Sequence, residues 1–432
     1  MPRTTPTGQG PTGEPGEELP LFTAAVQAGR SDQAIFRHYT SGPPIDVHDP
    51  RLDADPATLT ERLRGHSGQT WRKQRDEDGA EDAPMRPFAP DGLIEFLPRP
   101  FGRCYLHPSA VPEPMVDELP LLLGHDGSAG NTFLVLALEG RGVHPFVHAT
   151  TALPHAQLAG SGRRTVVLPR HTFDPKGNVR DNISTWALER FREVYGSLPI
   201  RHGHDPGSIP PSLSEVRAAR AQGIRRRPYR KATTDRSITS ADVLHYTYAV
   251  MNDPGWSIRS EEGVAPPGPI RIVLHPDLEA WCSMGQELLE LHLGHEMLEG
   301  WPLTVTPLPA PLLERIVHDD DGAAHLWRLR MRVDKAEGWI EIDGRIRVDG
   351  VPARAWDLMM GGRSALDRMI DQYKEMVLHP GRSAKEERLA RERYLDRFVR
   401  TLRRVCRLSL ETQRIQQLIG ALPHAMPAGQ PE

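Results

Sequence analysis

Three side chains in the second half of the sequence have the types and spacing of metal ligands. His292, His295 and Glu296 stand in the segment LHLGHEML at positions i, i+3 and i+4. On a helix they share one face, where imidazole and carboxylate groups can ligate zinc. The metalloprotease pattern instead needs two histidines four residues apart, with a glutamate beside the first. We therefore interpret them as hydrogen-bonded or surface residues of an apolar helix, and keep a metal-dependent hydrolase as the less favoured alternative.

A dense basic cluster indicates a different chemistry, contact with phosphates. Its members are Arg225, Arg226, Arg227, Arg230 and Lys231. Closely spaced cations release counterions when they contact DNA, so such a segment can bind the backbone without reading sequence. A solvated linker, or a contact with an acidic partner surface, accounts for the same residues equally well.

A second set of arginines alternates with apolar residues, as in a β-strand with one charged face. The set is Arg328, Arg330 and Arg332 on one expected strand, with Arg345 and Arg347 on its neighbour. Five cations on one sheet face repel one another unless acids or phosphates lie opposite. Acids that could supply part of this compensation are Glu341, Asp334 and Asp343. The pattern leaves two interpretations open, ion-paired strands or a surface that faces DNA.

The sequence lacks the motifs of several enzyme classes. It has no P-loop lysine motif, no GxGxxG fingerprint after a strand and no GxSxG nucleophile elbow. It also lacks the glycine-rich loop and the Asn-Pro-Pro-aromatic tetrapeptide of an adenine methyltransferase, for which Asp-Pro-Gly-Trp at 253–256 is no substitute. We therefore predict no catalytic residue, no metal and no cofactor, and we favour a binding role.

Composition indicates a soluble globular protein. The 432 residues are 38% hydrophobic and 25% charged, which is enough chain for two domains with separate cores. No apolar run approaches the roughly 20 residues that span a bilayer, and the N-terminus has no signal-peptide core. The distant cysteines Cys104, Cys282 and Cys406 argue against a disulfide framework or a zinc ribbon. We expect a cytoplasmic protein without membrane contact.

Periodicity and turn residues predict mainly β structure in the first half. A short charged helix is expected at about 58–74, and strands at 134–138 and 165–168. Asn182 or Ser184 can cap the helix that closes this half, because each side chain can accept a hydrogen bond from the first helical turn.

The second half mixes helices with antiparallel hairpins. A capping box at Thr239–Asp242 predicts the start of one helix, and an apolar helix is expected at about 277–298. Asp343-Gly344 supplies the positive φ angles of a tight hairpin turn. A last amphipathic helix is expected at about 384–419, with the arginine-rich run 397–408 interpreted as its outer face.

These expectations combine into an α+β fold with a defined layout. We predict a β-rich coupling domain followed by a mixed α/β specificity domain with antiparallel hairpins and a long C-terminal helix. The expected boundaries are 1–57 for a disordered or loosely ordered segment, 58–196 for the coupling domain, 197–237 for a basic linker, 238–422 for the specificity domain and 423–432 for a disordered tail.

Several sequence blocks, taken in order, carry a resemblance to a known family. The blocks are RPFGRCYLH at 99–107, VVLPRHTFD at 166–174, RDNISTWALERFREVYG at 180–196, ITSADVLHYTYAVMNDPGW at 238–256, LELHLGHE at 289–296, VDGVPARAWDLMMGGRSALDRMIDQY at 348–373 and VCRLSLETQRIQQLI at 405–419. Over about 85–422 the chain resembles the C-terminal coupling and specificity region of type ISP restriction–modification enzymes. The family usually has an aromatic residue at the position of His295, which weakens the metal interpretation further.

The resemblance implies a function that composition alone does not indicate. In the family this module reads a target sequence in duplex DNA for a linked methyltransferase and helicase-nuclease. Those parts are missing from this sequence, and 197–237 is longer than the usual linker. The resemblance therefore implies a stand-alone specificity subunit of a split restriction–modification or phage-defence system, and it carries over no base-reading residue.

We accordingly predict a non-catalytic subunit that recognises a sequence in duplex DNA. Its expected partners are duplex DNA and a methyltransferase, a helicase-nuclease or both, with the two arginine-rich sets above at the DNA. The alternative is a protein-interaction adaptor without DNA contact, because the formal net charge of −4 is unusual for a free-standing nucleic-acid binder.

Overall fold

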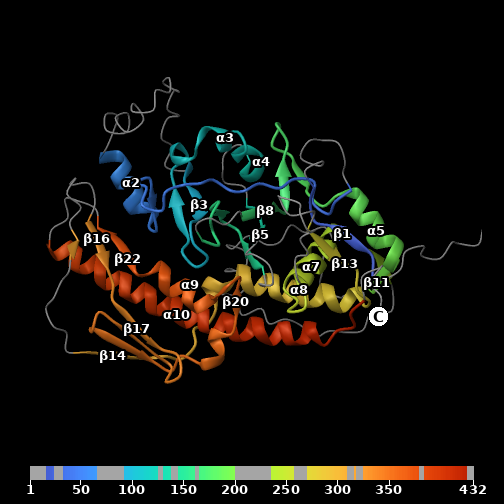
Figure 1. The fold of residues 1–432 in the computed structure, drawn as a ribbon. Helices are drawn as coiled ribbons and strands as arrows, with labels where there is room; N and C mark the ends of the chain where they lie inside the picture. Colours follow the sequence, from blue (N-terminus) through green and yellow to red (C-terminus); the bar gives the residue numbers. More distant parts are fainter. Residues whose placement is uncertain are drawn as a thin grey trace, which may run out of the picture.

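Helices and small, mostly antiparallel sheets are interleaved along the chain, which confirms the predicted α+β class (Figure 1). The computed structural model describes residues 16–23, 33–65, 92–124, 130–137, 145–160, 165–199, 235–256, 270–308, 316–317, 325–378 and 384–425. No helix within these ranges is both long enough and apolar enough to cross a bilayer.

A three-stranded antiparallel sheet of order β6-β5-β8 lies at the centre of the molecule (Figure 1). Its strands are β5 (Phe133–Ala137), β6 (Phe146–Thr150) and β8 (Thr165–Pro169), all fully buried. Both faces are covered, since Phe133 and Val135 belong to one hydrophobic cluster and Leu134 and Leu136 to another. Side chains alternate across a strand, so this sheet separates two cores, and its central strand β5 is apolar without interruption.

Short elements from the first half cover the first cluster. The strands are β2 (Leu52–Asp53), β3 (Ile94–Leu97), β4 (Cys104–Leu106) and β7 (Leu153–Pro154), in the order β2-β4-β3-β7. The helices are α2 (Pro56–Gly65), η3 (Pro108–Ala110), α3 (Glu113–Val116) and α4 (Leu119–Leu123). The charged helix expected at about 58–74 thus begins earlier, and residues after Gly65 lie outside the described ranges until 92. The three cysteines are buried, and none of them forms a disulfide.

Three helices and paired short strands enclose the second cluster. The helices are α5 (Thr185–Tyr195), α7 (Ser240–Met251) and α8 (Leu278–Leu293). The antiparallel pairs are β1 (Glu18–Pro20) with β13 (Arg271–Val273), β9 (His171–Phe173) with β10 (Val179–Asp181), and β11 (Ser197–Pro199) with β12 (Asp235–Ser237). The predicted caps are confirmed, with Ser184 at the start of α5 and the capping box of Thr239 and Asp242 at the start of α7.

The C-terminal part adds two sheets and the longest helix. One sheet has the order β14 (Thr304–Pro307), β19 (Ile346–Asp349), β18 (Trp339–Ile342) and β17 (Met331–Asp334). The other has the order β15 (Ile316–Val317), β16 (His325–Arg328) and β22 (Glu375–Leu378). The remaining elements are η4 (His295–Met297), η5 (Ala353–Trp356), β20 (Met359–Met360), β21 (Arg363–Ser364), α9 (Ala365–Gln372) and α10 (Ala384–Gly420).

Two predictions for this C-terminal part are confirmed by local geometry. Asp343 and Gly344 form the turn of the β18–β19 hairpin with φ angles of 52° and 66°. The long helix α10 covers the expected range, and in Figure 1 it runs alongside α8.

Residues 16–23 and 33–57 belong to the segment 1–57 that was predicted to be disordered or loosely ordered, and some of them lie in a core. The strand β1 pairs with β13, and Leu19, Leu21 and Phe36 are at most 1% exposed in the second cluster. These apolar side chains are scattered among Pro and Gly, so the composition of the segment does not predict that they are buried. They nevertheless form part of the second cluster.

The hydrophobic cores do not follow the predicted domain boundaries. The first cluster joins Phe96 and Val135 to Leu402, and the second joins Phe191 to Trp281. Each cluster therefore combines residues from before and after the segment 197–237. The assignment of the two halves as coupling and specificity domains stays a prediction, but their cores are shared rather than separate.

Candidate nucleic-acid interface

The basic cluster predicted between the two halves lies outside the described residues. Its members are Arg225, Arg226, Arg227, Arg230 and Lys231, within the segment 200–234 that joins β11 to β12. These two strands pair antiparallel, with Ser197 opposite Ser237. The residues that flank the segment are therefore held side by side, and its phosphate-binding role stays a prediction.

The arginines at 328, 330 and 332 do not share one strand, as the alternation had predicted. Arg328 is the last residue of β16, and Arg332 is the second residue of β17. Arg330 lies in the connection, and the two strands belong to different sheets. The prediction of five arginines on one continuous sheet face is therefore wrong.

Backbone hydrogen bonds at residues 329 and 330 explain the break. The N–H of Leu329 donates to the carbonyl of Lys374, directly before β22, over 2.8 Å. The N–H of Arg330 donates to the carboxylate of Asp343, in the β18–β19 turn, over 2.7 Å. The chain thus leaves one sheet and enters the other within two residues. The alternation of arginines and apolar residues in the sequence does not reveal this change.

Two of the predicted arginines and one predicted acid share a row across the sheet. Arg332 on β17 is opposite Glu341 on β18, which in turn is opposite Arg347 on β19. Arg332 Nη1 lies 3.8 Å from Glu341 Oε1. The side chain of Arg332 is 74% exposed, so this pair contributes little to stability and leaves the guanidinium accessible.

Arg347 is more firmly held than its neighbour in the row. Its Nε donates to Asp349 over 2.9 Å, and its guanidinium lies 4.5 Å from the ring centroid of Trp339. A cation over an aromatic face gains electrostatic attraction and loses freedom of movement. Arg347 is thus oriented before any ligand arrives.

Two of the three acids that were predicted to compensate the arginines accept hydrogen bonds from backbone N–H groups. Asp334 accepts backbone N–H groups of the following turn, and Asp343 accepts that of Arg330. Arg345 is half-buried directly after the turn. Arg347 has an acidic partner, as the interpretation of ion-paired strands expects, whereas Arg330 is exposed. The interpretation of a surface that faces DNA stays a prediction.

The arginine-rich run in α10 was assigned only to an outer helix face. Phe398, Leu402 and Val405 are fully buried, so the expected core face is confirmed. Arg397 and Arg400 are exposed on another side of the same helix. Their helical spacing was visible in the sequence, but nothing there showed which arginines lack an acidic partner.

The candidate metal ligands His292 and His295 are held by hydrogen bonds inside the protein. His292 Nδ1 lies 2.5 Å from the hydroxyl of Tyr248, and its Nε2 lies 2.9 Å from the hydroxyl of Thr412. His295 Nδ1 donates to the carbonyl of His292 over 2.8 Å. Both ring nitrogens of His292 are thus occupied by protein partners, and these contacts support the interpretation of hydrogen-bonded core histidines.

Glu296 is also engaged, by an arginine of the first half. Its Oε1 accepts from Arg103 Nε over 3.1 Å, and Arg103 also forms an ion pair with Glu95. Across the described ranges no group of three His, Cys, Asp or Glu side chains is arranged to hold a metal ion. Glu296 therefore joins η4 to the β3–β4 hairpin.

His148, His292 and His295 form a buried cluster between β6 and α8. The rings of His148 and His295 are 6.3 Å apart. Burial, together with a smaller effect of the nearby His295, lowers the pKa of His292 to about 3. Burial also holds the pKa of His148 well below its usual value, helped by the two other histidines and by Arg103.

We expect the free energy of unfolding to fall as the pH drops below about 6.5, where histidines of the unfolded chain protonate. Folded His292 stays neutral down to a pKa of about 3, and the pKa of His148 is also depressed. The unfolded state thus binds more protons in this window, so acid favours unfolding. Each such histidine contributes about 1.4 kcal/mol per pH unit. Urea denaturation at several pH values measures the slope.

His148→Gln isolates one member of the cluster. It keeps a polar, neutral side chain, so the slope of stability with pH is expected to fall by about 1.4 kcal/mol per pH unit. His48→Gln, at an exposed position, is the matched control and should leave the slope unchanged. Identical slopes for His148→Gln and the unmodified protein would contradict the prediction.

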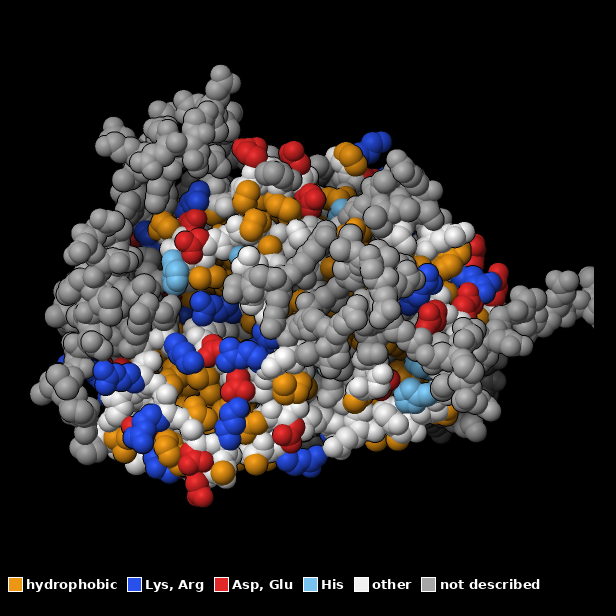
Figure 2. Space-filling model, in the orientation of Figure 1, with side chains coloured by type: hydrophobic (Ala, Val, Ile, Leu, Met, Phe, Trp, Pro, Cys, Tyr) orange, Lys and Arg blue, Asp and Glu red, His pale blue; other side chains and the backbone are white. Residues whose placement is uncertain are grey.

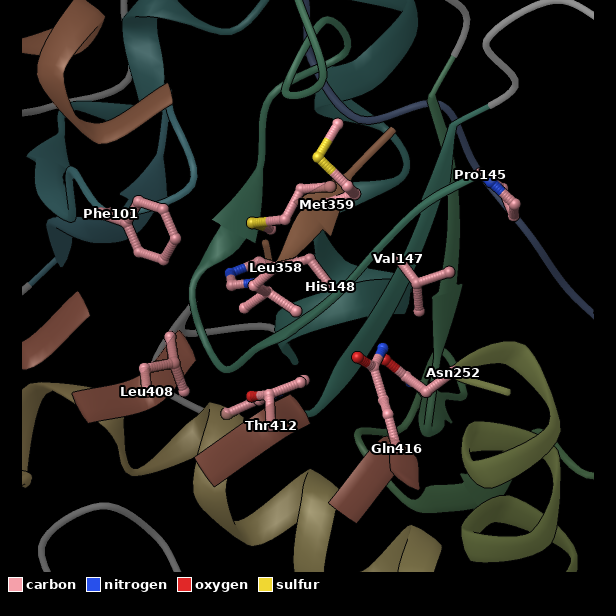
Figure 3. A pocket seen from close by; sticks show the side chains of 12 residues that line it. Phe101, Pro145, Val147, His148, Asn252, Leu358, Met359, Leu408, Thr412 and Gln416 are labelled. Carbon is pink, nitrogen blue, oxygen red and sulfur yellow. The ribbon is translucent and has the colours of Figure 1, made fainter. Parts of the chain in front are cut away.

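His148 and His292 of this cluster also line a small pocket (Figure 3). Leu408, Thr412 and Gln416 line it from α10, with Asn252 from the end of α7. Its lining contains no carboxylate and no thiol. The pocket therefore offers apolar contact, two imidazoles whose pKa values are lowered by burial, and a few neutral hydrogen-bonding groups.

One family model matches most of the chain. The model of the Type ISP C-terminal specificity domain matches residues 51–392. A search of curated proteins finds no match.

Solved structures share the fold at low sequence identity. The cryo-EM structure of a DrdV–DNA complex has a TM-score of 0.62 at 21% identity, and covers 95% of this chain and 39% of its own. The Type ISP restriction-modification enzyme LlaBIII, ATP-dependent and bound to DNA, has a TM-score of 0.58 at 14% identity, with 94% and 24% covered. A nuclease-deletion mutant of LlaGI with a DNA substrate mimic has a TM-score of 0.53 at 14% identity, with 91% and 28% covered. The chain thus spans well under half the length of these proteins.

Proposed function

This chain belongs to the family of type ISP C-terminal specificity domains, and from that membership we propose that it recognises a target sequence in duplex DNA. The family match over residues 51–392 carries the proposal. The three structures of similar fold are all complexes with DNA or a DNA mimic, which supports the same assignment.

The predicted arginines would position the duplex by its phosphates. Arg332 is accessible, and Arg347 is already oriented by Asp349 and Trp339. Guanidinium groups match phosphate geometry with two parallel hydrogen bonds. We assign the same role to Arg328, Arg330, Arg345 and the cluster at 225–231. Base edges in the major groove would be read by Arg, Asn or Gln side chains.

Chemistry on the DNA would come from other proteins or domains. We propose a methyltransferase, a helicase-nuclease or both as the partner, with this chain as the non-catalytic reader. Selection of bound duplexes from a random pool tests the recognition step. An enriched sequence, found alone or with such a partner, supports the proposal, and a pool that stays random in both conditions counts against it.

Arg332→Gln is expected to weaken DNA binding evenly across sequences. Loss of one phosphate contact should reduce the slope of log affinity against log salt by about 0.9 without changing the selected sequence. Affinity measured at several salt concentrations gives this slope. Arg180→Gln is the control, since Arg180 is 66% exposed on β10 and paired with Asp174. Equal slopes for both variants would show that Arg332 does not contact the DNA.

A protein-interaction adaptor is the second candidate, favoured by the net charge of −4. The two candidates differ in their response to salt. Binding to DNA should weaken steeply as salt rises, because counterions are released from the duplex. Association with a partner protein that is insensitive to salt, together with no affinity for DNA, would favour the adaptor.

A further inference from the structure

We propose that four arginines on α10 form a second contact with duplex DNA, which grips the sugar-phosphate backbone. The arginine stripe consists of Arg393, Arg397, Arg400 and Arg404. This inference rests on the proposed function, and it gives a role to a surface that the sequence predicts only as the outer face of a core helix.

Helical geometry places the four arginines on one face. Their spacing of i, i+4, i+7 and i+11 keeps them within one stripe, away from the buried Phe398. At about 1.5 Å per residue, the stripe extends about 17 Å along the axis. On the face shown in Figure 2, Lys and Arg side chains gather over the region where Figure 1 places α9, α10 and β17.

The positive charge of the stripe is not neutralised within the described part of the chain. Arg393, Arg397 and Arg400 are exposed, and none of them forms an ion pair with another residue that the structure describes. Elsewhere on α10 the pattern is different: Arg388 pairs with Glu392, Arg407 with Glu411, and Arg414 with Glu287. Like charges one helical turn apart destabilise a helix, so a stripe of this kind is best satisfied by an anion from outside.

The inner end of the stripe is already partly desolvated. Burial lowers the pKa of Arg404, and the neighbouring Arg400 lowers it further, whereas Glu296 opposes both. The carboxylate of Glu296 is held by Arg103, so its charge is shared. An external anion would therefore be attracted by the guanidinium groups of Arg400 and Arg404. Glu296 neutralises them only in part, because its carboxylate also binds Arg103.

Asp55 is an acidic neighbour of the middle of the stripe, and it is already engaged in hydrogen bonds. Arg397 lies close enough to Asp55 to lower the pKa of that carboxyl, although hydrogen bonds from Thr58 lower it more. Asp55 accepts both the hydroxyl and the N–H of Thr58, at 2.6 and 3.2 Å. It thus serves as the first-turn cap of α2 and leaves Arg397 exposed.

The shape of the stripe favours a phosphodiester backbone over an acidic protein. A duplex presents one phosphate per strand about every 3.4 Å of its axis, so 17 Å of parallel contact passes about five phosphates of one strand. Guanidinium groups bind such phosphates through paired hydrogen bonds. Contacts with phosphates fix the position of the duplex and carry no sequence information, so a stripe that binds the backbone would not read the sequence.

The double substitution Arg397→Gln/Arg400→Gln tests the stripe. For the full chain and a labelled duplex, the slope of log affinity against log salt should fall by about 1.8, which is two phosphate contacts. The affinity for every duplex should fall by the same factor, so the preferred sequence stays the same. The melting temperature should be unchanged or higher, since two like charges have been removed.

Two matched variants complete the experiment. Arg388→Gln/Arg414→Gln removes the same charge from the same helix at ion-paired positions and should leave the slope close to that of the unmodified protein. Arg397→Lys/Arg400→Lys keeps the charge and should retain most of the slope. If the unmodified protein binds no duplex, the proposed function fails and the stripe with it. If it binds DNA while Arg397→Gln/Arg400→Gln matches the control, only the stripe is overturned, as expected if an acidic protein covers it.

Discussion

Asp242→Ala is expected to destabilise the protein by about 3–5 kcal/mol, because it leaves a partly buried arginine without its counterion. Asp242 is 4% exposed. Both terminal nitrogens of Arg236 donate to it over 2.6 Å, and the N–H of Thr239 donates over 2.8 Å. Burial alone would raise the pKa of Asp242, but these hydrogen bonds outweigh it and hold the pKa below its usual value. Urea denaturation measures the loss.

Asp367→Ala is the matched control for this substitution. Asp367 occupies the same position in α9, with Ser364 as the N-cap and Lys335 as its ion-pair partner. Its side chain is 30% exposed, so its ion pair is worth at most about 1 kcal/mol. Equal losses for the two alanine variants would show that burial is not the cause.

Gly285→Ala is expected to cost about 3 kcal/mol, the upper range for overpacking of a tight core. Gly285 lies where α8 crosses α7, and a Cβ atom there would be 1.7 Å from the carbonyl oxygen of His245. That atom is backbone and cannot rotate away, so the two helices must separate. Thermal and urea denaturation of the variant measure the cost.

Gly420→Ala is the corresponding control. Gly420 is the last residue of α10, and an added Cβ there would meet no atom within 4 Å. Its effect should stay within about 0.5 kcal/mol, as at other surface positions. A Gly285→Ala variant as stable as Gly420→Ala would mean that the α7–α8 crossing tolerates a wider spacing.

Local signals in the sequence predicted the elements that depend on neighbouring residues. The capping box of Thr239 and Asp242 and the turn at Asp343-Gly344 each need only four residues to form. The period of Phe398, Leu402 and Val405 likewise identified the core face of α10. Each of these signals depends on residues that lie within one or two turns of the same segment.

Features that depend on distant contacts were missed. Pairing of Glu18 with Val273 cannot be recognised from either segment alone. The alternation around Leu329 looked like one strand because nothing local shows that Lys374 and Asp343 draw successive backbone groups into different sheets. Composition likewise suggested two separate cores, whereas both faces of β5 are buried by clusters shared between the halves.

The candidate interface was predictable only in part. The sequence identified arginine-rich segments and, through family resemblance, a role at DNA. It could not show that Arg347 is fixed by Trp339 and Asp349. Nor could it show that, among the described residues, Arg397 and Arg400 form no ion pair like that of Arg414 with Glu287. Charge compensation is set by side chains from other elements, so it emerges only when the chain is folded.

The pairing of β1 with β13 also bears on how the protein is made. Arg271, the first residue of β13, comes 253 positions after Glu18, the first residue of β1. At a synthesis rate of about 5–20 residues per second, β1 leaves the ribosome roughly 13–50 s before its partner does. During that time, Leu19 and Leu21 are exposed to water or covered by a chaperone. The last contacts of the second core can therefore close only after most of the polypeptide has been translated.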